Sequence, residues 1–73
     1  MTNILLTGSS RGIGAACFQA LADAGATVVG HATRDGARAI GADLDRPGSA
    51  VTLWDAALER LDGRIDVLVN NAG

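Results

Sequence analysis

Apolar and polar positions alternate in blocks along the chain, and four of the apolar blocks predict strands. Residues 4–6 are wholly apolar and lead into Gly8, and residues 26–30 form a similar run. Such runs are typical of strands covered on both faces, as in a parallel sheet. Residues 39–42 predict a weaker third strand, and residues 65–69 predict a fourth.

A first helix is predicted directly after the glycine-rich segment that follows residues 4–6. Apolar residues recur there at three- and four-residue spacing, which predicts one buried stripe. Gly25 stands where a left-handed residue would end the helix. The expected stripe is Ile13, Ala16, Cys17, Ala20, Leu21 and Ala24.

A second helix is predicted in the stretch that precedes the fourth strand. Asp45 or Ser49 supplies the expected N-terminal capping oxygen, and Asp62-Gly63 ends the helix. Its apolar stripe is expected to be Val51, Trp54, Leu58 and Leu61.

The order strand, helix, strand, strand, helix, strand predicts an α/β fold. It is the N-terminal part of a Rossmann-type doubly wound parallel sheet of about four strands. The polar segment 33–38 is too short for a crossover helix and is expected to be a loop. With 73 residues, the chain is expected to be one partial domain over 1–73.

Composition narrows the function classes. A net charge of −2 gives no general attraction for nucleic acid or anionic lipid. No apolar stretch approaches the length of a membrane span, and nothing resembles a signal peptide. Cys17 is the single cysteine, so it has no disulfide partner and is expected to pack in the core. The expectation is a soluble cytoplasmic protein without a metal cluster.

The segment T-G-S-S-R-G-I-G at 7–14 carries the clearest chemistry. It follows a predicted strand and opens a predicted helix, as a dinucleotide-binding loop must. Gly8 permits the tight turn, Gly12 leaves room for a cofactor, and Gly14 lets the helix pack closely. The helix N-terminus would then face a pyrophosphate. An ordinary glycine-rich turn is the alternative interpretation of the same residues.

Two motifs together resemble the short-chain dehydrogenase/reductase family. They are T-G-x-x-x-G-x-G at 7–14 and N-N-A-G at 70–73, and the resemblance extends over essentially the whole chain. The subgroup most similar is that of the 3-oxoacyl-[acyl-carrier-protein] reductases, although the short segment after the second strand departs from it. The resemblance implies hydride transfer between a nicotinamide cofactor and a carbonyl or alcohol substrate, in a homo-oligomeric parent protein.

The family resemblance also implies a set of cofactor contacts. Asp43 matches the acid that bonds the adenine amino group, and Leu44 matches its neighbour; a turn or capping carboxylate is the alternative for Asp43. Asn70 matches a residue that steadies the sheet. The remaining implied contacts are Gly8, Ser9, Ser10, Arg11, Gly12, Ile13 and Gly14 in the loop, and Asn71, Ala72 and Gly73 beside the ribose and pyrophosphate.

The end of the second strand favours NADP(H) over NAD(H). NAD-specific proteins place an acid there, which would repel a 2′-phosphate, whereas no acid precedes Asp35 in this chain. Arg11 resembles the family's phosphate-binding basic residue, and Thr33 and Arg34 could assist it. Asp35 could fold back toward the ribose and weaken the preference. His31 is expected to be a partly exposed residue at the strand end.

No catalytic residue is expected within these 73 residues. The family uses a Ser, a Tyr and a Lys, and this chain contains no tyrosine. Those residues are expected beyond Gly73, so the chain alone is not expected to be active. The favoured interpretation is the N-terminal fragment of an oxidoreductase. The alternative is a complete non-catalytic nucleotide-binding or relic module, and the downstream reading frame would discriminate between them.

Overall fold

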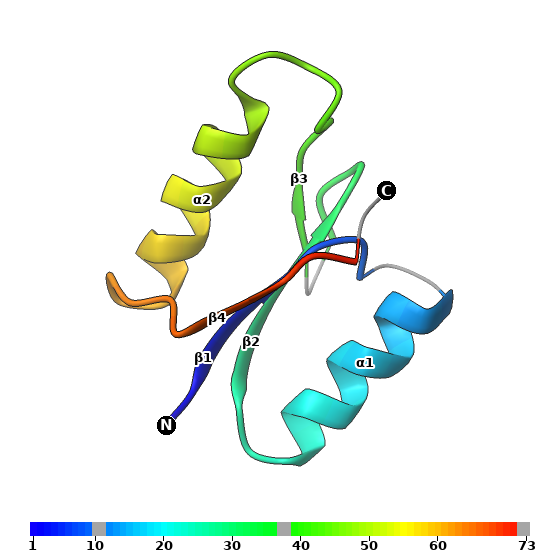
Figure 1. Ribbon diagram of the computed structural model, residues 1–73, viewed down its shortest axis with the longest axis vertical. Coiled ribbons are helices and arrows are strands. Elements are labelled where there is room, and N and C mark those ends of the chain that lie inside the picture. The colour runs from blue at the N-terminus through cyan, green and yellow to red at the C-terminus, as the bar shows by residue number, and fades with distance from the viewer. Residues whose placement is uncertain (10–11, 37–38, 72–73) are drawn as a thin grey trace.

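A computed structural model of the chain describes residues 1–9, 12–36 and 39–71. Four strands and two helices alternate in the predicted order (Figure 1). They are β1 (Asn3–Leu6), α1 (Gly12–Asp23), β2 (Thr27–Ala32), β3 (Ala39–Gly41), α2 (Ser49–Arg60) and β4 (Val67–Val69).

The four strands form one parallel sheet in the order β3-β2-β1-β4. β1 lies in the middle, with Leu5 paired to Val29 on one side and to Leu68 on the other. The two helices cover opposite faces of this sheet (Figure 1). The predicted doubly wound α/β fold is therefore confirmed, including the weak third strand.

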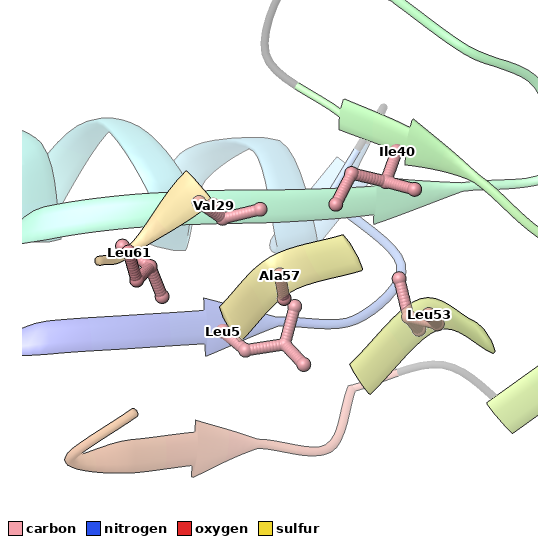
Figure 2. Packing of buried hydrophobic residues seen from close by; sticks show 6 residues of the cluster. All are labelled: Leu5, Val29, Ile40, Leu53, Ala57 and Leu61. Atoms are coloured by element: carbon pink, nitrogen blue, oxygen red, sulfur yellow. The ribbon is translucent and has the colours of Figure 1, made fainter. Parts of the chain in front are cut away.

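The core between the sheet and α2 consists of side chains from three strands and one helix face (Figure 2). Because side chains alternate along a strand, Ile4 and Leu6 point to the other face, which α1 covers. Leu5 and Leu6 are almost fully buried. The core residues under α2 are Leu5, Val29, Ile40, Leu53, Ala57 and Leu61.

The stripe predicted for α1 is wrong. Ile13 is 77% exposed, and the residues that α1 buries are Gly14 and Phe18. α1 is apolar on most of its circumference, so periodicity alone did not select one face. Gly14 lies against the backbone of Gly8, and residues four apart share a helix face, so Phe18 faces the sheet as well. Cys17, expected in the core, is only half-buried.

The stripe predicted for α2 is wrong in the same way. Val51 is 65% exposed and Trp54 is 39% exposed, whereas Leu53 and Ala57 are buried; of the predicted stripe, only Leu61 is buried. Ala57 is small and fully buried, which lets the helix approach the sheet closely. The apolar pattern favoured the bulkier residues of α2, so the sequence did not predict that Ala57 is buried.

The N-terminal cap expected for α2 is also wrong. Gly48 occupies the capping position with φ 81°, and none of the described side chains caps the helix. Ser49 is the first helical residue, and its Oγ donates to the carbonyl of Arg46 at 2.9 Å. The left-handed Gly25 and the break at Asp62-Gly63 are present as predicted.

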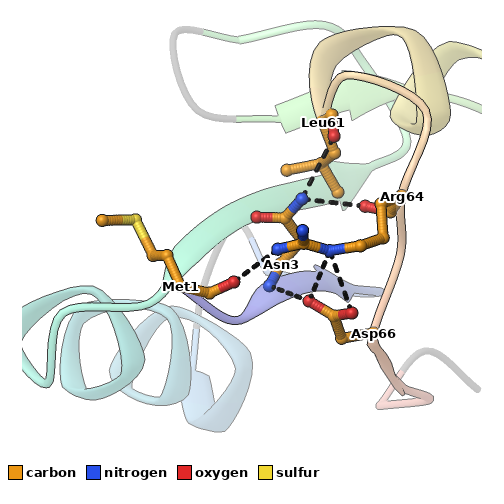
Figure 3. A network of polar contacts seen from close by, with 5 residues as sticks. All are labelled: Met1, Asn3, Leu61, Arg64 and Asp66. Carbon is orange, nitrogen blue, oxygen red and sulfur yellow. Dashed lines mark hydrogen bonds and ion pairs between the residues drawn. The ribbon is translucent and has the colours of Figure 1, made fainter.

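A polar network ties the turn after α2 to the start of β1 (Figure 3). The Asn3 side-chain amide donates to the carbonyls of Leu61 at 3.1 Å and Arg64 at 3.0 Å. The Asn3 backbone N–H donates to Asp66 Oδ2 at 2.8 Å, and Arg64 Nε lies 3.1 Å from Asp66 Oδ1. This network stabilises the amino ends of β1 and β4, at the end of the sheet opposite the glycine loop.

The same network predicts a contribution to acid stability. The Asn3 backbone N–H, and after it the Arg64 side chain, lower the pKa of Asp66 below 3.8. A lowered pKa in the folded state means that the stabilisation is present above the unfolded value and is lost as pH falls through the folded one. The stability of Asp66→Asn should therefore depend less on pH than that of the native protein below about pH 4.

Urea unfolding at pH 7 and at pH 3 measures this effect. Asp55→Asn, which removes an exposed carboxylate on α2, is the charge-matched control and should follow the native pH dependence. An identical loss of stability on acidification in the native protein and in Asp66→Asn would remove Asp66 from this role.

Candidate functional site

The glycine loop leaves the carboxyl end of β1 and leads into α1. Gly8 and Gly12 have φ angles of 68° and 63°, in the left-handed region that glycine adopts without strain. Ser9 is buried, and its backbone N–H donates to the carbonyl of His31 at 2.7 Å. The loop is therefore fastened to the end of β2, at the sheet edge where ligands bind in this architecture.

Gly14 shows the close approach that the sequence predicts. A Cβ atom at this position would collide with the carbonyl group of Gly8 and would lie 2.7 Å from Asn71 Nδ2. At Gly12, by contrast, a Cβ atom would meet none of the described residues within 4 Å. The loop thus packs tightly against α1 at one glycine and faces open space at the other.

The two sequence motifs meet through Thr7. Its buried hydroxyl accepts a hydrogen bond from the Asn71 backbone N–H at 3.0 Å, and it lies 3.3 Å from Asn70 Oδ1. The Asn71 side-chain amide donates to the Gly8 carbonyl at 3.1 Å. Segments more than sixty residues apart in the sequence therefore form one surface at the carboxyl ends of β1 and β4.

His31 is buried, whereas the sequence predicts a partly exposed residue at the strand end. It is only 5% exposed, because β2 continues to Ala32 and so includes His31 instead of ending before it. The ring Nδ1 accepts from the Gly8 backbone N–H at 3.1 Å, and Nε2 lies 2.8 Å from the carbonyl of Ala42. The imidazole thus connects the glycine loop with the segment after β3.

A groove of about 730 Å³ lies at the carboxyl ends of β2 and β3. It brings together Thr33, Arg34 and Asp43, three of the sequence-predicted contacts, and adds Arg46. All four residues are exposed. The sequence analysis did not predict Arg46 as a contact. Its N–H donates to the Asp43 carbonyl at 3.0 Å and closes a turn. The spacing of three residues from Asp43 was the signal that could have placed Arg46 in the groove.

The carboxylates beside this groove are held by backbone groups. Asp35 Oδ1 accepts from the Gly41 N–H at 2.6 Å, so this carboxylate turns onto β3. Asp43 Oδ1 accepts from the Asp45 N–H at 3.0 Å, which is the turn role considered as its alternative. Leu44 is 38% exposed and lines a separate apolar hollow beside Trp54 and Leu68.

The candidate contacts thus fall into two groups among the described residues. The loop and Asn71 form one group, and Thr33, Arg34 and Asp43 form the other. Leu44 belongs to neither group, because it lines the separate apolar hollow. Ile13 belongs to the loop but turns its side chain to the surface. The predicted contacts Ser10, Arg11, Ala72 and Gly73 lie outside the described residues.

The sequence profile of the short chain dehydrogenase family matches residues 2–73, which includes both motifs. This chain belongs to the short-chain dehydrogenase family. The glycine loop and Asn71 both lie within the matched residues, and the hydrogen bonds of Thr7 and Gly8 bring them together.

Curated relatives agree with this assignment. The chain is 42% identical to the 3-oxoacyl-[acyl-carrier-protein] reductase FabG of Vibrio harveyi, over 94% of this chain and 33% of that protein. It is 36% identical to the L-fucose dehydrogenase of Bos taurus, over 96% of this chain and 30% of that protein. The chain spans about a third of the length of the relatives it matches.

Solved structures of the short-chain dehydrogenase family have the same fold. The 3-alpha-hydroxysteroid dehydrogenase of Pseudomonas sp. B-0831, complexed with NADH, is 46% identical with a TM-score of 0.85. That match covers 99% of this chain and 31% of the other. An oxidoreductase of Brucella ovis is 35% identical with a TM-score of 0.79, over 100% of this chain and 36% of the other.

Neither α1 nor α2, the helices in the described ranges 1–9, 12–36 and 39–71, is long and apolar enough to cross a membrane.

Proposed function

We propose that this chain is the cofactor-binding N-terminal portion of an NADP(H)-dependent short-chain oxidoreductase that acts on a carbonyl or alcohol substrate. The observation that carries the proposal is the turn at Gly12, where α1 begins and where a Cβ atom would meet no atom of the described residues within 4 Å. A glycine at this position leaves the N-terminus of the helix open to a pyrophosphate group. Membership of the short-chain dehydrogenase family supports the same assignment.

In this proposal, the cofactor extends across both groups of contacts. The pyrophosphate and ribose would contact the loop from Gly8 to Gly14 together with Asn71, Ala72 and Gly73. The adenine would lie near Asp43 and Leu44, and the 2′-phosphate would face Arg11, Thr33 and Arg34. When bound, the nicotinamide would donate a hydride to a carbonyl or accept one from an alcohol.

The preference for the phosphorylated cofactor rests on charge at the groove. Arg34 and Arg46 line it, and so do Asp35 and Asp43, whose carboxylates accept hydrogen bonds from the backbone N–H groups of Gly41 and Asp45. A charge-assisted hydrogen bond is worth about 1.5–3 kcal/mol, so one arginine contact to the 2′-phosphate changes affinity roughly ten- to a hundredfold. A carboxylate that already accepts a hydrogen bond from a backbone N–H opposes that phosphate less than a carboxylate without such a partner.

NAD(H) is the second candidate cofactor, and one comparison favours it. The 3-alpha-hydroxysteroid dehydrogenase, which is 46% identical to this chain, is complexed with NADH. Asp35 could accept a hydrogen bond from a ribose 2′-hydroxyl if it left Gly41. Binding of the two cofactors must therefore be compared directly.

Titration with NADPH and with NADH tests the proposed cofactor. We expect NADPH to bind at least about tenfold more tightly than NADH. Arg11→Ala and Arg34→Ala should each weaken NADPH binding while leaving NADH binding nearly unchanged. Arg60→Ala is the matched control, because Arg60 is an exposed arginine at the end of α2. Equal losses for both cofactors would remove the arginines from phosphate binding, and tighter NADH binding would favour the second candidate.

We further propose that the Ser, Tyr and Lys of the reaction belong to sequence that follows Gly73 in a cytoplasmic, homo-oligomeric parent enzyme. A reading frame that continues to a Tyr-x-x-x-Lys segment supports this proposal. A frame that ends at Gly73 supports the non-catalytic nucleotide-binding module instead.

A further inference from the structure

His31 lies where three segments of the site meet. Its ring Nδ1 accepts from the Gly8 N–H, and its ring Nε2 contacts the Ala42 carbonyl. Its own carbonyl accepts from the backbone N–H of Ser9 at 2.7 Å and from the Ser9 hydroxyl at 3.3 Å. A single buried residue of β2 is therefore joined to the glycine loop on one side and to the segment after β3 on the other.

The partners of the ring select one protonation state. A backbone N–H can only donate, so the Nδ1 that faces Gly8 must be unprotonated. A carbonyl oxygen can only accept, so the Nε2 that faces Ala42 must carry the hydrogen. His31 is therefore a neutral imidazole with its proton on Nε2, and both ring nitrogens are used.

The two ring partners belong to the two halves of the proposed site. Gly8 begins the loop that would contact the pyrophosphate, and Ala42 directly precedes Asp43 in the groove at the ends of β2 and β3. These regions are separate in sequence, and both lie at the carboxyl ends of the parallel strands (Figure 1). One imidazole ring thus spans the distance between their backbones, in addition to the bonds that the Ser9 and Ala42 N–H groups donate to carbonyls of β2.

We propose that His31 is a positioning residue that holds the glycine loop at the correct separation from the Asp43 segment, so that one dinucleotide can contact both. This inference rests on the proposed cofactor-binding function. A ligand that contacts two segments at once binds tightly only when their separation is already correct, because moving them on binding costs free energy. His31 acts through the backbone and need not touch the cofactor.

Three substitutions of His31 test the two hydrogen bonds of its ring separately. His31→Asn keeps an acceptor near the Nδ1 position, His31→Gln keeps a donor near the Nε2 position, and His31→Leu keeps similar bulk with neither bond. We expect His31→Leu to weaken NADPH binding about 10- to 100-fold, and His31→Asn and His31→Gln to give intermediate losses. The measurement is titration of the protein, expressed with its natural flanking sequence, well below its unfolding temperature.

Val29→Ala is the control for a merely structural role. Val29 is buried in the same strand and makes only apolar contacts in the core. It should lower the unfolding temperature while the folded protein keeps its affinity for NADPH. Loss of affinity in proportion to the loss of stability in both Val29→Ala and the His31 variants would overturn the proposal. So would a folded His31→Leu that binds as tightly as the native protein.

Two further results complete the test. If His31→Leu does not fold, the NADPH affinities of His31→Asn and His31→Gln test the proposal instead. Native affinity for NADPH in both variants would overturn it. Nitrogen-15 spectra of the imidazole in the cofactor-free protein at pH 8 should show an unprotonated Nδ1 and a protonated Nε2. The opposite tautomer would overturn the inference even if NADPH binds. A native protein that shows this tautomer but binds neither NADPH nor NADH would instead refute the proposed function, and the inference with it.

Discussion

Gly14→Ala is expected to destabilise the protein by about 1–3 kcal/mol and to weaken cofactor binding together with it. The added methyl group would collide with the Gly8 carbonyl and would crowd the Asn71 side-chain amide. The Gly8 carbonyl belongs to the backbone, so it cannot move aside without shifting the glycine loop. A loss of this size should lower the unfolding temperature by about 4–8 °C per kcal/mol, which differential scanning calorimetry measures.

Gly36→Ala is the matched control for this substitution. A Cβ atom at Gly36 would meet nothing within 4 Å, and its φ lies outside the left-handed region. Alanine there should be neutral or slightly stabilising, because it restricts the unfolded chain. Equal unfolding temperatures for Gly14→Ala and the native protein would show that α1 does not pack against the loop as described.

Leu53→Ala is expected to cost about 2–5 kcal/mol of stability. Leu53 is 4% exposed and packs in the core between α2 and the sheet, where its removal would leave a cavity. In a domain of this size, such a loss is a large part of the total free energy of unfolding. Chemical denaturation should show a lower midpoint, and thermal unfolding should shift in parallel.

Val51→Ala tests the face of α2 that the sequence pattern predicts to be buried. Val51 is 65% exposed, so its replacement should change stability by no more than about 0.5 kcal/mol. Alanine also has the higher helix propensity, which offsets part of any loss. A larger loss at Val51 than at Leu53 would mean that α2 is rotated relative to the sheet and that the stripe expected from the sequence is correct.

The candidate site could be predicted only in part. The glycine loop and the N-N-A-G segment were recognisable because each is contiguous and has its own signature. That Thr7 and Gly8 bond Asn71 depends on the pairing of β1 with β4, which no short segment encodes. Arg46 joins the groove for a related reason, because a turn after β3 returns it toward the end of β2.

His31 shows most clearly how the folded chain differs from what the sequence predicts. Its sequence position suggested a partly exposed residue, since the predicted strand ended at Gly30. In the folded chain, β2 continues to Ala32 because β3 pairs with it from Gly30 onward. Burial of the imidazole and both of its ring bonds follow from that pairing.

The sequence by itself determined the kind and order of the elements, the glycine loop and the family. These depend on local properties, namely the spacing of apolar residues and the freedom of glycine to adopt positive φ. Only the tertiary structure decided which faces of α1 and α2 are buried, where the carboxylate of Asp35 turns, and what His31 bonds. Both helices carry apolar residues on more than one face, so contacts between distant segments had to select among them.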